Sequence, residues 1–251
     1  MSQPPVAPDG VALTILDLGL FEVHEDGRVI GIPAYLIRSG AALLLVDTGF
    51  PAAYALDPVA AGRIDGLDAF GVVRALDATQ TLAAQLARCS VSPAMITHLV
   101  LTHSHIDHVG GLHQFPGATL VLGRAERAAP RPLYWGERRP LAWPDQPQRL
   151  IDADAQIAPG VTLLRTPGHT PGHLSLLVES PDGRAVVLAA DAISRPQELS
   201  EDRFAGAWDP ALARASAHRL VALAAGRGAR LIYGHDPAQW PALPKAPERV
   251  L

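Results

Sequence analysis

Short apolar runs alternate with polar, glycine-rich or proline-rich breaks along most of the 251-residue chain. Residues 11–23 alternate loosely between apolar and polar positions, which predicts a strand. Residues 32–38 and 42–47 are apolar runs separated by a serine and a glycine, a pattern that predicts a β-hairpin. The second run ends in Asp47, at the start of a polar loop. This part of the chain is therefore expected to be β-structure.

Farther along the chain, the predicted strands outnumber the predicted helices. A helix begins near Thr79, and residues 98–102 form a short buried strand. A longer helix covers residues 210–225, with Asp209 as its N-cap. Further strands are predicted at residues 119–122, 149–152, 155–158, 161–165, 173–179, 185–190 and 231–233. The tail after Pro237 is rich in proline and is expected to lie on the surface.

Two stretches lack a clean periodicity. Residues 51–78 are rich in proline, glycine, alanine and aspartate, and we interpret them as a loop or flexible lobe with one short helix. Residues 130–149 carry many prolines and predict an irregular excursion. No shift of composition marks a domain boundary, so residues 1–251 are expected to form a single domain. Many strands with few helices between them favour a layered α/β or α+β fold.

A cluster of polar residues directly follows the predicted strand at 98–102. His103, His105, Asp107 and His108 fall within six positions. Imidazole nitrogens and carboxylate oxygens are ligands of borderline metals such as zinc. Alternate residues of an extended segment point the same way, so the first two histidines can hold one ion together. The aspartate and the third histidine can then face a neighbouring ion.

Three further donors lie downstream, each at the predicted end of a strand: His169, Asp191 and His235. A site made from His103, His105 and His169 would have three imidazole ligands and an open position. That arrangement is typical of catalytic rather than structural zinc. Zinc is the physical default for such donors, and iron, manganese or cobalt could occupy the same site.

A second site made from Asp107, His108 and His235 would be richer in oxygen, and Asp191 has two carboxylate oxygens with which to bridge both ions. One zinc ion lowers the pKa of bound water from near 16 to about 7. A hydroxide held between two such ions is a nucleophile at neutral pH. We therefore expect hydrolysis of an ester, lactone, thioester or phosphoester, without a serine or cysteine nucleophile.

Composition narrows the range of partners. The net charge of −4 argues against nucleic acid, because phosphate binding needs clustered lysine and arginine. The single cysteine, Cys89, excludes an internal disulfide and a multi-cysteine zinc site. No apolar run of about 18 residues is available for membrane insertion, and residues 1–10 do not resemble a signal peptide. We expect a cytoplasmic monomer or homodimer with a small-molecule substrate.

The ordered set of donors resembles that of the metallo-beta-lactamase superfamily. The H-x-H-x-D-H pattern of that family is matched at residues 103–108, and the later histidine, bridging aspartate and final histidine are matched in order. The resemblance implies an αββα sandwich of two mixed β-sheets flanked by helices, with two divalent metal ions at one edge. It also implies that Asp47 lies behind the ligands and orders the metal loop. His173 is a second candidate for such a role, because it shares a loop with His169.

Within the superfamily, the C-terminal third of the chain is most similar to the quorum-quenching N-acyl homoserine lactonases. The similar stretches are residues 191–193, 208–210 and 233–240. The segment 51–78 resembles the part of those enzymes that helps to shape the substrate entrance. The resemblance implies a dinuclear zinc lactonase in which a bridging hydroxide attacks the lactone carbonyl. Asp107, or a water that it orients, would carry the proton to the leaving alkoxide.

One position departs from the lactonase pattern. Those enzymes carry a tyrosine three residues after the bridging aspartate, where this chain has Ser194, whose hydroxyl is too short to reach the same point. Tyr134 or Tyr233 could take over that contact. The candidates for an acyl-chain pocket are Phe50, Tyr54, Phe70, Tyr134, Trp135 and Phe204.

Alternative functions remain open from the sequence. Another small lactone or ester would suit a serine at position 194. A glutathione thioester is less favoured, because the C-terminus offers only Lys245 and Arg249 to hold its carboxylates. β-Lactamases of this fold place a cysteine among their ligands, and Cys89 lies far from every ligand motif. A non-catalytic metal-binding domain is disfavoured, since the ligand set is complete.

Overall fold

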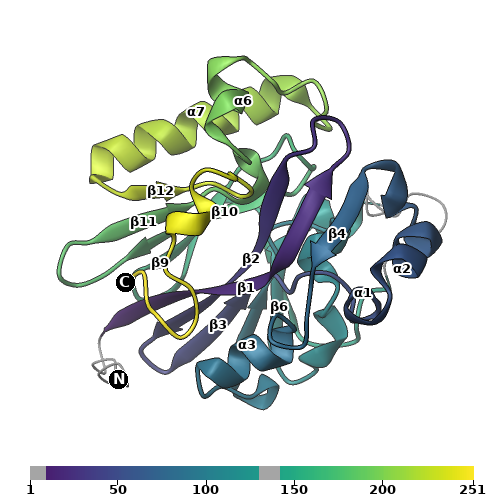
Figure 1. Cartoon of the computed structure of the whole chain (residues 1–251). Helices are drawn as coiled ribbons and strands as arrows, with labels where there is room; N and C mark the ends of the chain where they lie inside the picture. Colours follow the sequence, from purple (N-terminus) through teal and green to yellow (C-terminus); the bar gives the residue numbers. More distant parts are fainter. Residues whose placement is uncertain (1–9, 130–141) are drawn as a thin grey trace.

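The computed structural model describes residues 10–129 and 142–251, and these residues form two β-sheets that pack face to face (Figure 1). The first sheet has the strand order β4-β1-β2-β3-β5-β6-β7, and the second has the order β12-β11-β10-β9-β8. The strands of the first sheet are β1 (Val11–Val23), β2 (Val29–Ser39), β3 (Ala42–Val46), β4 (Gly71–Ala75), β5 (His98–Val100), β6 (Thr119–Gly123) and β7 (Gln148–Ile151). Those of the second are β8 (Ala155–Ala158), β9 (Val161–Arg165), β10 (Leu174–Glu179), β11 (Ala185–Leu188) and β12 (Arg230–Ile232).

Both sheets are mixed. Strands β3, β5, β6 and β7 run parallel to one another, as do β11 and β12, whereas the other paired strands are antiparallel. Parallel neighbours need a crossover connection, so the chain leaves the sheet after each parallel strand. Those crossovers leave the ends of several strands at the same edge of the sandwich.

The core lies on both faces of each sheet. Along β1, Leu13 and Ile15 point into the interface between the two sheets, whereas Leu16 and Leu18 belong to the cluster under the helices. In β10, Leu176 likewise faces the first sheet. Side chains of a strand alternate between its faces, so a strand buried on both sides must be apolar at nearly every position. This explains the continuous apolar runs of the sequence.

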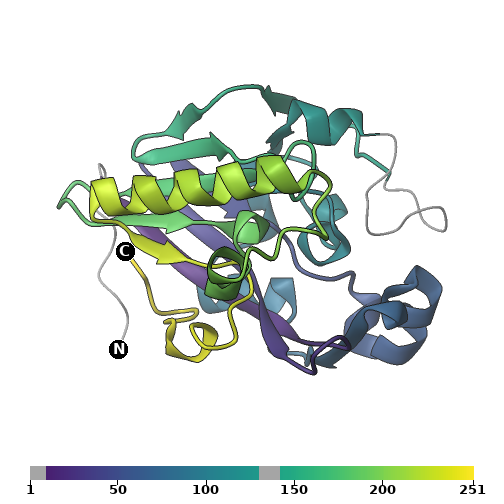
Figure 2. The ribbon, with the colours of Figure 1, turned by 90° about the horizontal axis from the view of Figure 1, so that it is seen from above.

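Helices cover the two outer faces. Helix α3 packs against β1 of the first sheet, and α7 lies along β11 and β12 of the second, as Figure 2 shows from above. The α-helices are α1 (Ala53–Leu56), α2 (Pro58–Asp65), α3 (Leu82–Arg88), α4 (Ile106–Val109), α5 (Arg124–Ala128), α6 (Pro196–Ser200) and α7 (Pro210–Arg227). Short 3₁₀ turns occupy Leu67–Ala69, Pro93–Met95, Leu112–Gln114, Ala190–Ala192 and Trp240–Ala242. The expected αββα sandwich of two mixed sheets is confirmed.

Helix α7 begins as predicted. The carboxylate of Asp209 accepts hydrogen bonds from the backbone N–H groups of Ala211 and Leu212, which is the action of an N-cap. The helix ends at Arg227, two residues beyond the expected end, and Gly228 follows it in the left-handed conformation with φ +59°. In the described part of the chain, no helix is both long and apolar enough to cross a membrane.

Residues 51–78 are more regular than the predicted loop with one short helix. They form α1, α2, a 3₁₀ turn and strand β4. Asp57 caps α2 through the N–H of Ala60, Pro58 follows it, and Gly66 ends the helix with φ +77°. Strand β4 then pairs with β1. These capping residues were visible in the sequence, but their spacing is too short to give a periodic signal. Most of the predicted excursion at 130–149 lies outside the described residues.

The C-terminal tail is not confined to the surface, contrary to the prediction. The N–H of Val250 donates to the carbonyl of Leu13, and the N–H of Leu13 donates to that of Leu251. Strand β4 pairs with β1 only over residues 20–23, so the other end of that edge would otherwise expose unpaired backbone groups. The tail covers those groups and buries Leu243 and Leu251.

Candidate metal centre

The loops that leave four strands meet at one edge of the sandwich. Strand β5 leads into the H-x-H-x-D-H segment, in which His103 and His105 precede α4 and Asp107 and His108 lie on it. His169 lies between β9 and β10, Asp191 follows β11, and His235 follows β12. The N–H of Leu174 donates to the carbonyl of Thr102 at 2.8 Å, which ties the first loop to the second sheet. Both sheets therefore contribute to one site.

Seven imidazole and carboxylate groups gather there in two sets. Within each set, the possible ligand atoms all lie within 4.8 Å of one another. The first group is His103, His105, His169 and Asp191, and the second group is Asp107, His108 and His235. This division is the one expected from the spacing of the motifs.

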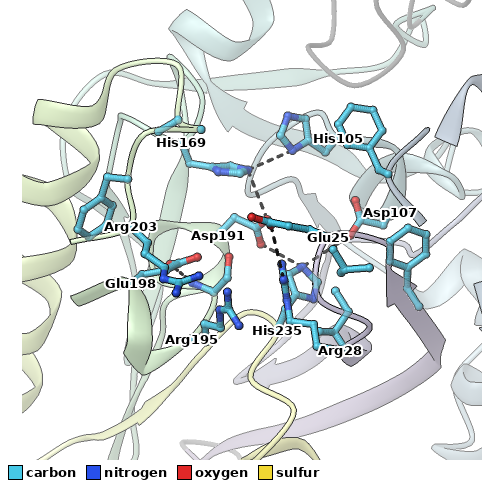
Figure 3. A pocket seen from close by; sticks show the side chains of 18 of the residues that line it. Glu25, Arg28, His105, Asp107, His169, Asp191, Arg195, Glu198, Arg203 and His235 are labelled. Atoms are coloured by element: carbon cyan, nitrogen blue, oxygen red, sulfur yellow. Dashed lines mark hydrogen bonds and ion pairs between the residues drawn. The ribbon is translucent and has the colours of Figure 1, made fainter. Parts of the chain in front are cut away.

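The carboxylate of Asp191 lies between the two groups (Figure 3). Its Oδ2 is 3.3 Å from Nε2 of His169 and 3.9 Å from Nε2 of His103. Its Oδ1 is 3.2 Å from Nε2 of His235 and 3.6 Å from Nε2 of His108. Each oxygen thus faces a different group, which is the geometry that a bridging carboxylate requires.

Several of these buried atoms have no hydrogen-bond partner among the described residues. They include Nε2 of His103, Nε2 of His108 and Oδ1 of Asp191. A buried polar atom left unsatisfied costs about 1–3 kcal/mol, so such atoms are rare in a folded protein. The three atoms lie within the two donor groups, which offer only nitrogen and oxygen, and this arrangement fits divalent metal ions.

Burial keeps the three histidines of the first group neutral. It lowers the pKa of His103 well below the usual value and that of His105 to about 3, and neighbouring histidines add to the effect. Burial also lowers the pKa of His169, although the charge of Asp191 opposes it. Neutral imidazole is the form that binds a metal, so this group needs no deprotonation at neutral pH.

The second group behaves in the opposite way. Burial lowers the pKa of His235, but the carboxylates of Asp191 and Asp107 outweigh it and raise that pKa to about 9. The pKa of His108 is likewise raised well above its usual value, because Asp107 and Asp47 outweigh the effect of burial. Conversely, burial opposes ionisation of Asp107, but the neighbouring His108 and His235 hold its pKa below the usual value. Without a metal ion, this group is a network of imidazolium and carboxylate.

Asp47 lies directly behind the site. Its Oδ1 accepts the N–H of Thr102, and its Oδ2 accepts the hydroxyl of the same residue. Oδ2 is also 2.8 Å from Nδ1 of His108, so the other nitrogen of that ring points into the second group. The backbone of Asp47 has φ +60°, a conformation that aspartate tolerates better than most residues. The structure thus places Asp47 where the family resemblance implied.

His173 supports Asp191 rather than facing the two groups. Its Nε2 accepts the backbone N–H of Asp191 at 3.1 Å, so its Nδ1 carries the proton and donates to the hydroxyl of Thr166. Burial lowers the pKa of His173 well below the usual value, which keeps the ring neutral and able to accept. Nδ1 of His235 donates in the same manner to the carbonyl of Gly31 at 2.9 Å.

Glu126 is a supporting residue that sequence reasoning missed. Its buried carboxylate accepts the backbone N–H and hydroxyl of Ser104, the hydroxyl of Thr170 and the N–H of Gly172. One side chain on α5 therefore joins the loop of His103 and His105 to the loop of His169. A lone glutamate among alanines and arginines of a short helix carries no signal of this role.

Close backbone approach explains one glycine of the motif. A Cβ on Gly110 would lie 2.1 Å from the backbone of Phe50 and of Pro51. The N–H of Gly110 donates to the carbonyl of Gly49 at 2.8 Å. A side chain at this position would therefore push the metal loop away from the loop of Asp47.

A cavity of about 680 Å³ opens above the two groups. Its metal floor is formed by five of the candidate ligands, namely His105, Asp107, His169, Asp191 and His235. An aromatic wall, which we define as Phe21, Phe50 and Phe70, lines another part of it. Ser194, Arg195 and Glu198 form a polar wall, of which Arg195 and Glu198 are labelled in Figure 3.

The predicted substrate contacts have mixed outcomes. Ser194, Phe50, Phe70 and Phe204 line the cavity. Tyr233 is absent from its lining and packs instead against the cluster under α7, because its neighbours in the chain pair with the second sheet. The buried ring of Tyr54 lies behind Phe50, and its hydroxyl donates to Asp65. Tyr134 and Trp135 lie outside the described residues.

A family model for the metallo-beta-lactamase superfamily matches residues 27–235. The chain belongs to the metallo-beta-lactamase superfamily. The matched region contains all seven candidate ligands and the aspartate behind them. Membership agrees with the two mixed sheets, the flanking helices and the donor groups at one edge.

Characterised members of the superfamily resemble the chain over most of its length. It is 31% identical over 220 residues to the N-acyl homoserine lactonase AiiA of Bacillus thuringiensis subsp. kurstaki, and the match covers 85% of each chain. It is 30% identical over 232 residues to the N-acyl homoserine lactonase AttM of Rhizobium johnstonii, with 87% of each chain covered.

Solved structures of the superfamily show the same arrangement. An N-acyl homoserine lactone hydrolase with N-hexanoyl-L-homoserine bound at its catalytic metal centre superimposes with a TM-score of 0.82 and 26% identity, covering 95% of this chain and 98% of that one. The dizinc quorum-quenching lactonase AidC matches with a TM-score of 0.64 and 20% identity, over 95% and 92% of the two chains, which supports the fold alone.

Replacing Glu126 tests whether it positions the metal ligands. In Glu126→Gln an amide N–H₂ replaces one acceptor oxygen, so hydrogen bonds to one of the two loops are lost. We expect the free energy of unfolding to fall by about 2 kcal/mol and zinc affinity to fall about tenfold. Urea unfolding and competition with a chromophoric chelator measure the two quantities.

The matched control is Glu179→Gln, which removes only an exposed ion pair with Arg227 and should change neither quantity. A Glu126→Gln protein that is less stable but binds zinc as tightly as the wild type would contradict the positioning role.

Proposed function

We propose that this protein is a metal-dependent hydrolase that opens the ring of N-acyl homoserine lactones. The observation that carries the proposal is the placement of Asp191, whose two oxygens face two donor groups at the floor of a partly apolar cavity. The lactonases AiiA and AttM, with which the chain shares about a third of its residues over most of its length, support the choice of substrate.

The two donor groups would each hold one ion, and zinc is the ion we propose. His103, His105 and His169 would hold the first ion through neutral nitrogens. Asp107, His108 and His235 would hold the second, and Asp191 would contribute one oxygen toward each group. The mixture of imidazole and carboxylate without thiolate suits zinc, and this donor set also accommodates iron, manganese or cobalt.

When bound, the ions supply Lewis acidity, which lowers the pKa of water and polarises the lactone carbonyl. The net reaction adds water to the carbonyl carbon and breaks the bond between that carbon and the ring oxygen. Asp107 is ionised and lies on the metal floor, so its carboxylate can take the proton released by water. It then delivers this proton to the ring oxygen, which leaves as an alcohol.

The cavity suits a substrate with one reactive end and one apolar arm. With the lactone on the metal floor, the acyl chain can lie against the aromatic wall. The rings of Phe21 and Phe50 lie 5.8 Å apart, so they offer a continuous apolar surface. Burial of each CH₂ group of the chain contributes about 0.8 kcal/mol to binding.

The first experiment is an assay of ring opening. Opening a lactone produces a carboxylic acid, so the zinc-loaded protein should release one proton for each N-acyl homoserine lactone consumed. A pH indicator in weak buffer follows the reaction, and protein stripped by a chelator is the control. Fast release that requires metal supports the proposal. If protein with two bound ions released no protons, the result would contradict the proposal and favour other esters or thioesters as substrates.

The second metal site can be tested through Asp107. In Asp107→Asn the carboxylate that joins His108 to His235 becomes a neutral amide, so the second site should lose its ion. We expect bound zinc to fall from two ions to about one and kcat/KM to fall at least about 100-fold. Elemental analysis and the proton-release assay give the two numbers. Asp182→Asn, in an exposed turn, is the control. Near-normal turnover with a single bound ion would contradict the two-metal proposal.

Metal loading should displace protons from the second group. His235, with a pKa of about 9, is protonated in the metal-free protein at neutral pH, and so is His108. A metal ion needs the unprotonated nitrogen, so loading both sites at about pH 7 should release about two protons from these imidazoles, in addition to those released as metal-bound water ionises. Apparent affinity should weaken as the pH is lowered. Zinc titrations by calorimetry in buffers of different ionisation enthalpy count the protons. Loading without proton release would show that the second group was neutral.

A further inference from the structure

The polar wall has no part in the chemistry described so far. Ser194 and Arg195 lie in the segment that leads from the turn of Asp191 into α6, and Glu198 lies on that helix. All three side chains line the cavity, and Figure 3 shows Arg195 and Glu198 on the Asp191 side of it. A purely aliphatic substrate would offer these polar side chains no hydrogen-bond partner.

Each arginine that lines the cavity has an acidic partner, and Arg28 and Arg195 share Asp26. Nη1 of Arg28 lies 2.7 Å from Oδ2 of Asp26, and Nη1 of Arg195 lies 3.3 Å from the same oxygen. Arg203, which also lines the cavity, pairs with Glu201 at 2.5 Å. Glu198 takes part in none of these ion pairs. The distinctive group of the polar wall is therefore a carboxylate, not a cation.

The carboxylate of Glu198 can accept more hydrogen bonds than it does in this structure. Its Oε2 accepts the backbone N–H of Ser194 at 2.7 Å, and the Ser194 hydroxyl also bonds to the carboxyl group. A carboxylate can accept about four hydrogen bonds. Burial raises the pKa of Glu198 to about 7, so its charge is poorly compensated by its present partners. An N–H donor from a molecule in the cavity would supply the missing stabilisation.

The position of Glu198 also matches a particular part of a lactone substrate. In an acylamino lactone, the amide nitrogen is two bonds from the carbonyl carbon that reacts, so it must lie beside the metal floor. Glu198 borders the same cavity as Asp191, and the negative charge of Asp191 is close enough to raise the pKa of Glu198. A group that recognises the amide has to lie in this part of the cavity.

We propose that the carboxylate of Glu198 accepts a hydrogen bond from the amide N–H of the substrate and thereby selects lactones that carry an acylamino group. The inference rests on the proposed function, because it concerns the same cavity and the same reaction. Glu198 is a specificity residue in this account, since it touches the substrate away from the bonds that change. An unsubstituted γ-lactone would gain nothing from it.

A simpler role for Glu198 makes a different prediction. It is the third residue of α6, and a carboxylate there that reaches back to a preceding N–H resembles part of a capping box. A residue that only caps α6 would affect the folding of that segment. Its loss would then reduce the hydrolysis of every lactone by the same factor. The two roles are separated by comparing substrates that differ only in the N–H.

The experiment uses two substrates and three variants of the zinc-loaded protein. The substrates are N-hexanoyl homoserine lactone and the analogue in which an ester oxygen replaces the amide N–H. Mass spectrometry of the ring-opened product gives kcat/KM for lactone opening in each case. Glu198→Leu removes the acceptor, and Glu198→Gln keeps an acceptor oxygen for both the substrate and Ser194. Gln197→Leu places the same leucine on the exposed neighbouring position of α6 and is the control.

We expect the wild type to prefer the amide substrate by about 10- to 100-fold, because a substrate without the N–H leaves the partly buried carboxylate of Glu198 short of one donor. Glu198→Leu should lose that preference by slowing only the amide substrate. Glu198→Gln should keep most of it, and Gln197→Leu should keep all of it.

Equal hydrolysis of amide and ester by the wild type, or an equal loss on both substrates in Glu198→Leu, would overturn the inference and leave the lactonase proposal intact. Failure of the wild type to open either ring would contradict the proposed function itself.

Discussion

The structure depends on placing six imidazole and carboxylate groups, three of them buried and three partly buried, around the carboxylate of Asp191. Such a cluster is unfavourable on its own, since burial opposes every charge in it and leaves several polar atoms unpaired. The histidines are neutral in the first group and charged in the second, although both groups are buried or partly buried. The difference follows from where the carboxylates lie, since the second group contains Asp107 and also borders Asp47. Divalent cations would resolve both conditions at once.

The rest of the fold holds this cluster in place. Asp47 directs His108, His173 fixes the backbone of Asp191, and Glu126 joins two loops from different sheets. A bridging geometry tolerates only small displacements, so the supporting hydrogen bonds matter as much as the ligands. The sandwich makes this arrangement possible because strands of both sheets end at one edge. The tie between Thr102 and Leu174 links the two sheets at that edge.

The sequence predicts which candidate ligands the fold brings together, because their chemistry is local. Four donors within six residues are conspicuous, and His169, Asp191 and His235 each follow an apolar strand. Most strands and the cap of α7 are also predicted, because alternation and capping act over a few residues. The supporting role of Glu126 is not predicted, since its hydrogen-bond partners are 22 to 46 residues away along the chain. Likewise, Tyr233 is adjacent to a ligand region in sequence, yet its ring turns away from the cavity. Side-chain direction at a loop depends on tertiary packing that no local pattern encodes.

The central claim is that Asp191 bridges two ions, each held by one donor group. Anomalous diffraction at the zinc edge from crystals of the zinc-loaded protein tests it most directly. The account predicts two peaks roughly 3.5–4 Å apart, one beside His103, His105 and His169 and the other beside Asp107, His108 and His235, with one oxygen of Asp191 on each. A single peak, or two peaks with Asp191 bound to only one of them, would contradict the account.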